Sequence, residues 1–416
     1  MNKIVLALLL LLMLVVSPLY AADEASVKDS IKLLRVFQNS KISGKIKLLW
    51  FFRDFYDDKT DWSTLALGGN LNFETASFHG FSAGVGFKTG HGNLAENDNK
   101  DVYRGLLALG DSVKDGKGYS ALDEYYIRYN RWETSFTLGA HQVVTPWLRN
   151  HDIRLTPKKY KGFSLINKKS IEMLELYGYY LTEWLDWTSD TWESIAIGIT
   201  DNPSDNEDAL IGGLIWRPRG SLKIQFWDYY FQEVMNDFYV HANYNIELHK
   251  DVLLSVDLKY LNRNDVGDKL KGEIATYMVG GNMGISAYGA TLTVYYGSIG
   301  NVKLLTPFGN VTIIRMQSST LSRALENAWA IKLKYKFNQV GIKGLSAYIF
   351  YANYSTPNYG ENVSPDKVEV DFNIQYKFSG CLKNCSIRLK HAIVDQDEEF
   401  NGRDWTDLKV FLQYSF

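Results

Sequence analysis

The chain ends on the nine residues LKVFLQYSF, Leu408 to Phe416, in which polar and apolar side chains alternate. The apolar positions of this alternation are Leu408, Val410, Leu412 and Tyr414, and the polar ones are Lys409, Gln413 and Ser415. Alternation with a period of two residues predicts a strand with one apolar face and one polar face. Such a strand suits the edge of a soluble sandwich or the wall of a membrane barrel.

The last residue favours the barrel. The chain stops on Phe416 without a polar tail. This ending resembles the assembly signal of bacterial outer-membrane barrels, in which a terminal Phe follows alternating apolar positions. The resemblance implies two partners for the chain, the barrel assembly machinery and the lipid of the outer membrane.

The other end of the chain carries an export signal. Met1 to Lys3 precede an apolar run from Ile4 to Val16, and a small-residue site follows at Ala21 and Ala22. This layout predicts a secretory signal peptide over residues 1–22. A single-pass anchor is the alternative, but the run is shorter than the roughly 20 residues that a spanning helix needs.

The composition of the remaining chain is compatible with a barrel. After residue 22 no run of about 18 apolar residues occurs, which excludes further membrane helices. Aromatic residues make up 14% of the chain, with 27 Tyr and 11 Trp, and the mean hydropathy is -0.21. Barrel strands are apolar only at alternate positions and carry aromatic girdles at the membrane interfaces, so they tolerate this modest hydropathy.

The period-two pattern begins at Gly44 and recurs to the C-terminus. Short turns such as Ser77–Gly80 alternate with long connections such as Thr89–Ser120, as periplasmic turns and outer loops do in bacterial barrels. The pattern yields nineteen candidate strands, and assigning Trp192–Asp201 to an outer loop leaves about eighteen. We therefore predict an all-β, transmembrane antiparallel barrel over residues 44–416, preceded by a periplasmic lead-in or short amphipathic helix over residues 23–43.

Several segments, in order along the chain, resemble the outer-membrane porins of the OprD family. The longest is LGAHQVVTPWLRNHDIRLTPKKYKGFSLIN, Leu138 to Asn167, and the others are RDFYDD from Arg53, GLSAYIFYANY from Gly344 and CSIRLKHA from Cys385. The resemblance implies a barrel of about eighteen strands whose third outer loop folds inward. It also implies passive, substrate-preferring uptake of small hydrophilic solutes that bear a carboxylate, such as organic acids or amino acids, by a monomer or a homotrimer.

The same resemblance implies a row of basic side chains that guides the carboxylate. Arg53 matches an early arginine of that row, Arg154 matches the arginine of the inward loop, and Arg388 and Lys390 match a pair on the penultimate strand. Phe350 stands where another arginine is expected, which weakens any expectation of selectivity for basic amino acids.

The strand pattern supports a basic lumen independently. Residues opposite the apolar face include Arg128 as well as Arg53, Arg388 and Lys390, whereas acids cluster in candidate loops such as DQDEE. Lysines and arginines that line a narrow pore can concentrate an anion there. The predicted solute-binding residues are therefore Arg53, Arg128, Arg149, Arg154, Arg388 and Lys390, although each could instead brace the wall through a salt bridge.

Other functions are less compatible with the residues. An outer-membrane hydrolase could use His151-Asp152 with Asp57-Asp58, but the spacing of these residues is unspecific. A structural or adhesive barrel remains an alternative. We expect no enzymatic activity, cofactor, metal or nucleic-acid partner. Cys381 and Cys385 flank a short periplasmic turn, and the oxidising compartment favours a local disulfide between them.

Overall fold

The structure, a computed structural model, describes residues 36–92, 99–150, 152–168, 170–309 and 312–416. The predicted signal peptide, residues 1–22, lies outside the described residues, as does most of the predicted lead-in. The described chain begins with a helical turn at residues 36–38 and enters the first strand at Lys41, three residues before the Gly44 expected from the pattern.

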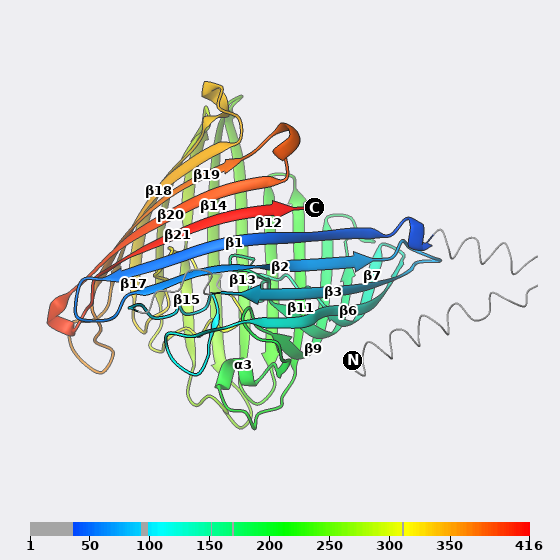
Figure 1. Ribbon diagram of the computed structural model, residues 1–416, viewed down its shortest axis with the longest axis horizontal. Helices are drawn as coiled ribbons and strands as arrows, with labels where there is room; N and C mark the ends of the chain where they lie inside the picture. Colours follow the sequence, from blue (N-terminus) through cyan, green and yellow to red (C-terminus); the bar gives the residue numbers. More distant parts are fainter. Residues whose placement is uncertain (1–35, 93–98, 151, 169, 310–311) are drawn as a thin grey trace, which may run out of the picture.

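The wall of the molecule is one closed antiparallel sheet (Figure 1). Eighteen long strands pair in sequence order, and the first and last strands pair with each other from Lys45–Ser415 to Phe55–Trp405. Closure leaves no sheet edge, which a barrel in lipid requires because every backbone group must find an internal partner. The predicted fold class is confirmed.

The strands of the wall are β1 (Lys41–Phe55), β2 (Trp62–Glu74), β3 (Phe81–His91), β6 (Tyr119–Arg131), β7 (Thr134–His141), β8 (Lys159–Asn167), β9 (Leu174–Leu185), β11 (Ala209–Arg219), β12 (Leu222–Phe231), β13 (Met235–His249), β14 (Val252–Asp265), β15 (Thr276–Ala287), β16 (Ala290–Ile299), β17 (Asn327–Lys336), β18 (Leu345–Ser355), β19 (Lys367–Lys377), β20 (Cys385–Gln396) and β21 (Trp405–Ser415). The short elements between them are β4 (Ala108–Leu109), β5 (Gly116–Lys117), β10 (Glu193–Ser194), α3 (Ile197–Thr200), η2 (Phe337–Val340), η3 (Gly380–Leu382) and η4 (Glu398–Phe400). Within the described ranges no helix is long and apolar enough to cross a membrane.

The ambiguous segment Trp192–Asp201 is part of a long loop, as predicted. It contains only the two-residue strand β10 and the single helical turn α3, which lies at the loop end of the barrel in Figure 1. Its apolar side chains Ile195, Ala196 and Ile199 are buried against the inside of the barrel rather than exposed to lipid. This burial explains why its sequence resembles a strand.

Alternation along the strands separates a lipid face from a lumen face. On β21, Leu412 and Tyr414 are 43% and 42% exposed, whereas Asp407 and Lys409 on the opposite face are buried. The other strands follow the same rule, so the outer surface is apolar and charged side chains point inward.

Three other long connections, which we call the 92–118, 142–158 and 300–326 loops, fold into the lumen over their described residues 99–118, 142–150 with 152–158, and 300–309 with 312–326. The second of these is the third long connection of the chain, so the predicted inward loop is confirmed. Phe308 of the 300–326 loop packs against Tyr160, Trp184 and Phe231 of the wall, with ring centroids 6.1, 5.1 and 5.9 Å away. This aromatic cluster holds the loop inside the barrel.

The terminal residue closes the barrel. Phe416 and Gly44 exchange two backbone hydrogen bonds of 3.0 and 3.1 Å. A Cβ at Gly44 would lie 2.7 Å from Cζ of Phe416 and 2.4 Å from the carbonyl oxygen of Asn70, so the close approach of the two ends requires glycine.

Deletion of Phe416 is therefore expected to reduce the amount of assembled barrel, because it removes these two bonds and the ring that covers Gly44. The measurement is the heat-modifiable, surface-exposed protein in outer-membrane fractions, with Phe416→Tyr as the control that keeps an aromatic end. Unchanged assembly after the deletion would count against the closing role.

Cys381 and Cys385 lie at the η3 turn between β19 and β20, at the end of the barrel with the short connections. Both thiols are free in the structure, Cys381 exposed and Cys385 half-buried. The structure thus lacks the disulfide favoured by the sequence.

Candidate functional site

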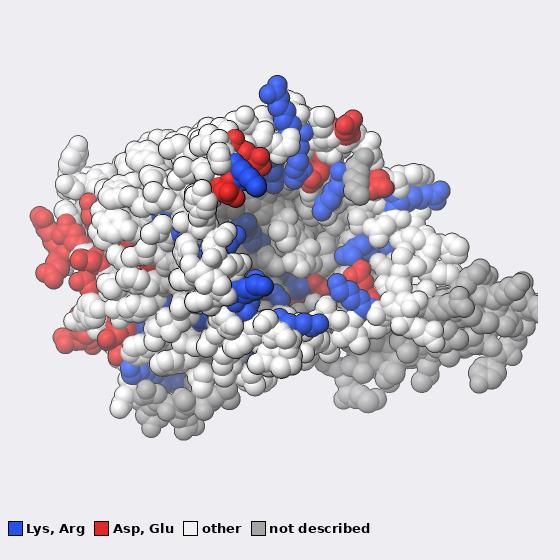
Figure 2. Space-filling view, turned by 90° about the horizontal axis from the view of Figure 1, so that it is seen from above, with Lys and Arg blue, Asp and Glu red and all other residues white. Residues whose placement is uncertain are grey.

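The inward loops enclose a cavity of about 360 Å³ against the wall. Loop residues from 142–158 and 300–326 form one side of it, and β17 to β21 form most of the other. Its basic lining residues are Arg154, Arg315, Lys332, Arg388, Lys390 and Lys409, and its acidic ones are Asp152 and Asp371. We call this space the first cavity; Figure 2 shows Lys and Arg side chains gathered around and within the hollow of the barrel.

The wall cations of the first cavity come from the lumen faces of adjacent strands. Lys390 of β20 lies directly opposite Lys409 of β21 in the register, and Arg388 lies opposite Phe411. Two like charges at facing positions destabilise a sheet. Lys409 forms a salt bridge of 3.1 Å with Asp407, and Arg388 donates from Nε to Oδ1 of Asn373 at 2.5 Å.

Lys332 of β17 is the cross-strand neighbour of Phe350 of β18. These two residues face each other on β17 and β18, and the Lys332 ammonium lies 4.8 Å from the Phe350 ring centroid and 4.1 Å from that of Tyr348. The resemblance implied an arginine at position 350, and the structure provides a cation from the neighbouring strand instead.

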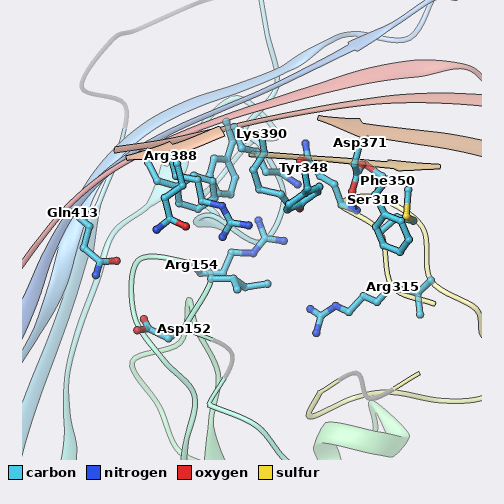
Figure 3. A pocket seen from close by; sticks show the side chains of 18 of the residues that line it. Asp152, Arg154, Arg315, Ser318, Tyr348, Phe350, Asp371, Arg388, Lys390 and Gln413 are labelled. Carbon is cyan, nitrogen blue, oxygen red and sulfur yellow. Dashed lines mark hydrogen bonds between the residues drawn. The ribbon is translucent and has the colours of Figure 1, made fainter. Parts of the chain in front are cut away.

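Arg154 projects from the 142–158 loop toward these wall cations (Figure 3). Its guanidinium carbon lies 5.4 Å from the centroid of the Phe51 ring and 5.5 Å from that of Trp187. Its backbone carbonyl accepts a hydrogen bond of 2.7 Å from Nζ of Lys47. The Nε and Nη1 atoms are buried and have no hydrogen-bond acceptor among the residues that the structure describes.

The loop cations are strongly desolvated. Burial lowers the pKa of the Arg154 guanidinium below its ordinary value. Burial, followed by repulsion from Arg149 and Arg154, lowers the pKa of Arg315 to about 10. Both groups keep their charge at neutral pH, but the cost of burying those charges favours an anionic partner.

Two acids of β19 clamp the tip of the 300–326 loop to the wall. The backbone N–H of Ser318 donates to Glu369 at 2.8 Å, and that of Ser319 donates to the same carboxylate at 2.7 Å. The backbone N–H of Gln317 donates to Asp371 at 2.9 Å. Three successive amides thus bind two inward carboxylates, which fixes the loop across the lumen.

Asp407 of β21 joins four elements at the seam of the barrel. It accepts hydrogen bonds from Arg53 at 2.7 Å, from the Tyr103 hydroxyl at 2.6 Å and from the Ser318 hydroxyl at 3.0 Å, in addition to the Lys409 contact. One buried carboxylate therefore holds the first strand, the last strand and two inward loops together.

A second cavity of about 510 Å³ adjoins the first through the shared residue Arg315. Its other basic lining residues are Arg149, Lys223 and Lys259, and His241 also faces it. His241 forms a close pair with Asp257 and a hydrogen bond of 2.9 Å with Gln225. Basic side chains thus extend through both cavities.

The six residues predicted from the sequence separate into three groups. Arg154, Arg388 and Lys390 line the first cavity together, and Arg149 lines the second. Arg53 pairs with Asp407 and stacks near three aromatic rings outside the lining of either cavity.

Arg128 is remote from both cavities. It forms a salt bridge of 2.7 Å with Glu74 and lines a separate hollow near the turn that joins β6 and β7. The structure therefore does not bring Arg128 together with the cavity-lining residues. Arg53 lies outside the lining but donates a hydrogen bond of 3.3 Å to the hydroxyl of Ser318, which lines the first cavity.

The predicted set omitted Arg315, which lines both cavities. It lies in the apolar stretch TIIRM, residues 312–316, within a long connection, and that stretch is a signal that the loop is buried rather than extended into solvent. Lys332 and Lys409 were also absent from the set, although strand alternation alone directs both of them into the lumen.

Comparison with known proteins identifies the family. The chain matches the outer membrane porin family OprD over residues 37–416. Porin D of Pseudomonas aeruginosa is 21% identical to it over 95% of each chain. The crystal structure of P. aeruginosa OccK9 (OpdG) superposes with a TM-score of 0.83 at 20% identity, covering 92% of this chain and 99% of that one. A crystal structure of P. aeruginosa OpdK with vanillate superposes with a TM-score of 0.80 at 19% identity and the same coverage. The chain therefore belongs to the OprD family of outer membrane porins.

Proposed function

We propose that this porin takes up small hydrophilic solutes that carry a carboxylate, with the first cavity as its selective site. The observation that carries the proposal is the composition of that cavity, which has six basic side chains against two acidic ones where the inward loops face the wall. The facing pair Lys390 and Lys409 adds to it, because wall stability alone would not favour two like charges at opposed positions.

Each proposed binding residue has a distinct part. Arg154 suits a carboxylate because a guanidinium can donate two parallel hydrogen bonds, and it has N–H groups that no described residue accepts. Arg388 and Lys390 attract the solute from the wall, and Arg149 extends the basic surface into the second cavity. Affinity must stay modest, since a tightly held solute would block the pore.

The remaining predicted residues have supporting roles in this proposal. The charge of Arg53 is matched by Asp407, and that of Arg128 is matched by Glu74, so both brace the wall more than they attract solute. The rings of Phe51, Trp187 and Phe411 line the first cavity and can contact the apolar part of a solute. Vanillate combines a carboxylate with an aromatic ring, and its presence in an OpdK structure supports carboxylate-bearing solutes as the class that this porin takes up.

The hydrolase alternative has little support. His151 of the proposed acid-base group lies outside the described residues, and Asp152 forms close ion pairs with Lys45 and Lys47. Asp57 at the outer rim pairs with Arg403. Carboxylates held in ion pairs are poor general bases, because the pairing favours their charged form and weakens their affinity for a proton.

Reversal potentials across planar bilayers test the proposal. We expect the native channel to prefer anions, and Arg154→Ala with Arg388→Ala to lose most of that preference, because two cations leave the lining of the first cavity. Lys383→Gln, at an exposed position in the turn before β20, is a control that removes a cation away from the cavities and should behave as the native channel does. A native channel that prefers cations, or a double variant with unchanged anion preference, would overturn the proposal.

A further inference from the structure

The basic residues of the first cavity form two groups on opposite sides. Arg154 and Arg315 come from the two inward loops, whereas Arg388 and Lys390 come from the wall strand β20 (Figure 3). Lys332 of β17 also lines the cavity. An anion in this cavity therefore has cations on its loop side and on its wall side.

The acids that line the cavity are already engaged with other groups. Asp152 is bound by Lys45 and Lys47, and Asp371 accepts the backbone N–H of Gln317. Neither forms a salt bridge with a cation of either group in the described part of the chain. The lining acids thus do not neutralise Arg154, Arg388 or Lys390.

Three of these cations have no salt bridge within the described residues. Nε and Nη1 of Arg154 have no acceptor in the described chain, Nε of Arg388 donates to the neutral amide of Asn373, and Lys390 lies opposite another lysine. A monocarboxylate can neutralise one side of the cavity but leaves the other side with unmatched charge in a desolvated space. An anion with a carboxylate at each end matches both sides.

The size and the walls of the cavity suit a short linker between the two carboxylates. Its volume of about 360 Å³ is near the lower end of small-molecule pockets. Aromatic rings of Phe51, Phe350 and Phe411 lie among the cations and provide apolar contact for methylene groups.

We propose that the first cavity recognises small dicarboxylates in preference to monocarboxylates, with one carboxylate on Arg154 and the other on Arg388 and Lys390. This inference rests on the proposed carboxylate uptake and goes beyond it, because it assigns two charged subsites in place of one.

The test compares each diacid with its own monomethyl ester, which keeps the carbon chain and removes one charge. The measurement is the concentration that halves the ionic current of single native channels in planar bilayers, for diacids of four to six carbons at pH 7.5. For at least one diacid, we expect the concentration that halves the current to be about tenfold lower than for its monoester. This ratio corresponds to about tenfold higher affinity for the diacid.

Variants assign that advantage to the two subsites. Arg154→Gln is expected to bring the diacid and the monoester to within about twofold of each other, a difference of less than 1 kcal/mol, and Arg154→Lys should keep part of the preference because it keeps the charge. Lys334→Gln removes a cation from the same wall, one inward position from Lys332 and outside the lining of the first cavity, and should leave the ratio unchanged. The presence of single-channel current shows that each variant is assembled.

The outcomes separate this inference from the proposed function. Equal action of diacids and monoesters on the native channel, or an advantage that survives Arg154→Gln, would overturn the two-subsite inference and leave carboxylate uptake intact. Absence of any effect of either compound class would overturn both.

Discussion

Replacing Glu369 and Asp371 together by alanine is expected to loosen the tip of the 300–326 loop, which keeps its side-chain hydrogen bonds to Asp407, and to raise the single-channel conductance. The two carboxylates accept three backbone hydrogen bonds from Gln317, Ser318 and Ser319. Hydrogen bonds to charged groups contribute about 1.5 to 3 kcal/mol each. Since each 1.4 kcal/mol changes a population ratio about tenfold, the released state should gain at least about two orders of magnitude.

Only the tip of this loop should move. The rest is held by Phe308 in the aromatic cluster and by Arg263, whose Nη1 donates to the carbonyl oxygen of Leu305 at 3.0 Å. We therefore expect a wider and noisier channel rather than loss of the barrel. The measurements are single-channel conductance and the variance of the open-state current in planar bilayers.

Isosteric variants distinguish the clamp from a simple effect of charge. Glu369→Gln with Asp371→Asn removes both charges but keeps one oxygen acceptor on each side chain, so two of the three amides keep a partner. Its conductance should lie between the native value and that of the alanine variant. Glu361→Ala, at an exposed position in an outer loop, is a control for removing an acid. If the isosteric and alanine variants gave the same increase, the carboxylates would act through charge and the clamp would be wrong.

Asp237→Ala is expected to have the largest effect on stability. Asp237 and Arg263 are fully buried and joined by two hydrogen bonds of 2.7 and 2.6 Å. The Arg263 guanidinium also lies 5.5 Å from the Trp147 ring of the 142–158 loop and binds Leu305 of the 300–326 loop. Removing one partner of a buried ion pair costs about 3 to 5 kcal/mol because the remaining charge is uncompensated.

One measure of this effect is the temperature at which the barrel loses its heat-modifiable form in detergent. Because this unfolding is irreversible, the unfolding rates of the variants should also be compared at one fixed temperature. Asp237→Leu with Arg263→Met should recover much of the loss, since well-packed apolar residues can replace a buried pair. Asp57→Ala breaks the exposed pair with Arg403 and should change little. A stable Asp237→Ala barrel would show that Arg263 finds another partner and does not depend on this one.

The features that could be predicted from the sequence are those that depend on local side-chain alternation. The period-two pattern is local, because successive side chains of a strand point to opposite faces. It therefore predicted the lipid face of β21, the inward direction of Arg388 and Lys390, and a barrel of about eighteen strands. The segment Trp192–Asp201 shows the limit of this argument, since burial inside a barrel and exposure to lipid select the same apolar residues.

The sequence by itself determined which side chains enter the lumen, but only the tertiary structure decided which charges are neutralised there. Arg53 meets Asp407, 354 positions along the chain, because closure of the sheet brings the two ends together. Arg128 and Arg154 were indistinguishable as basic residues, yet one meets Glu74 and the other meets two aromatic rings. The paths of the long loops decide these partners, and those paths depend on contacts between segments far apart in sequence, which a local pattern does not contain.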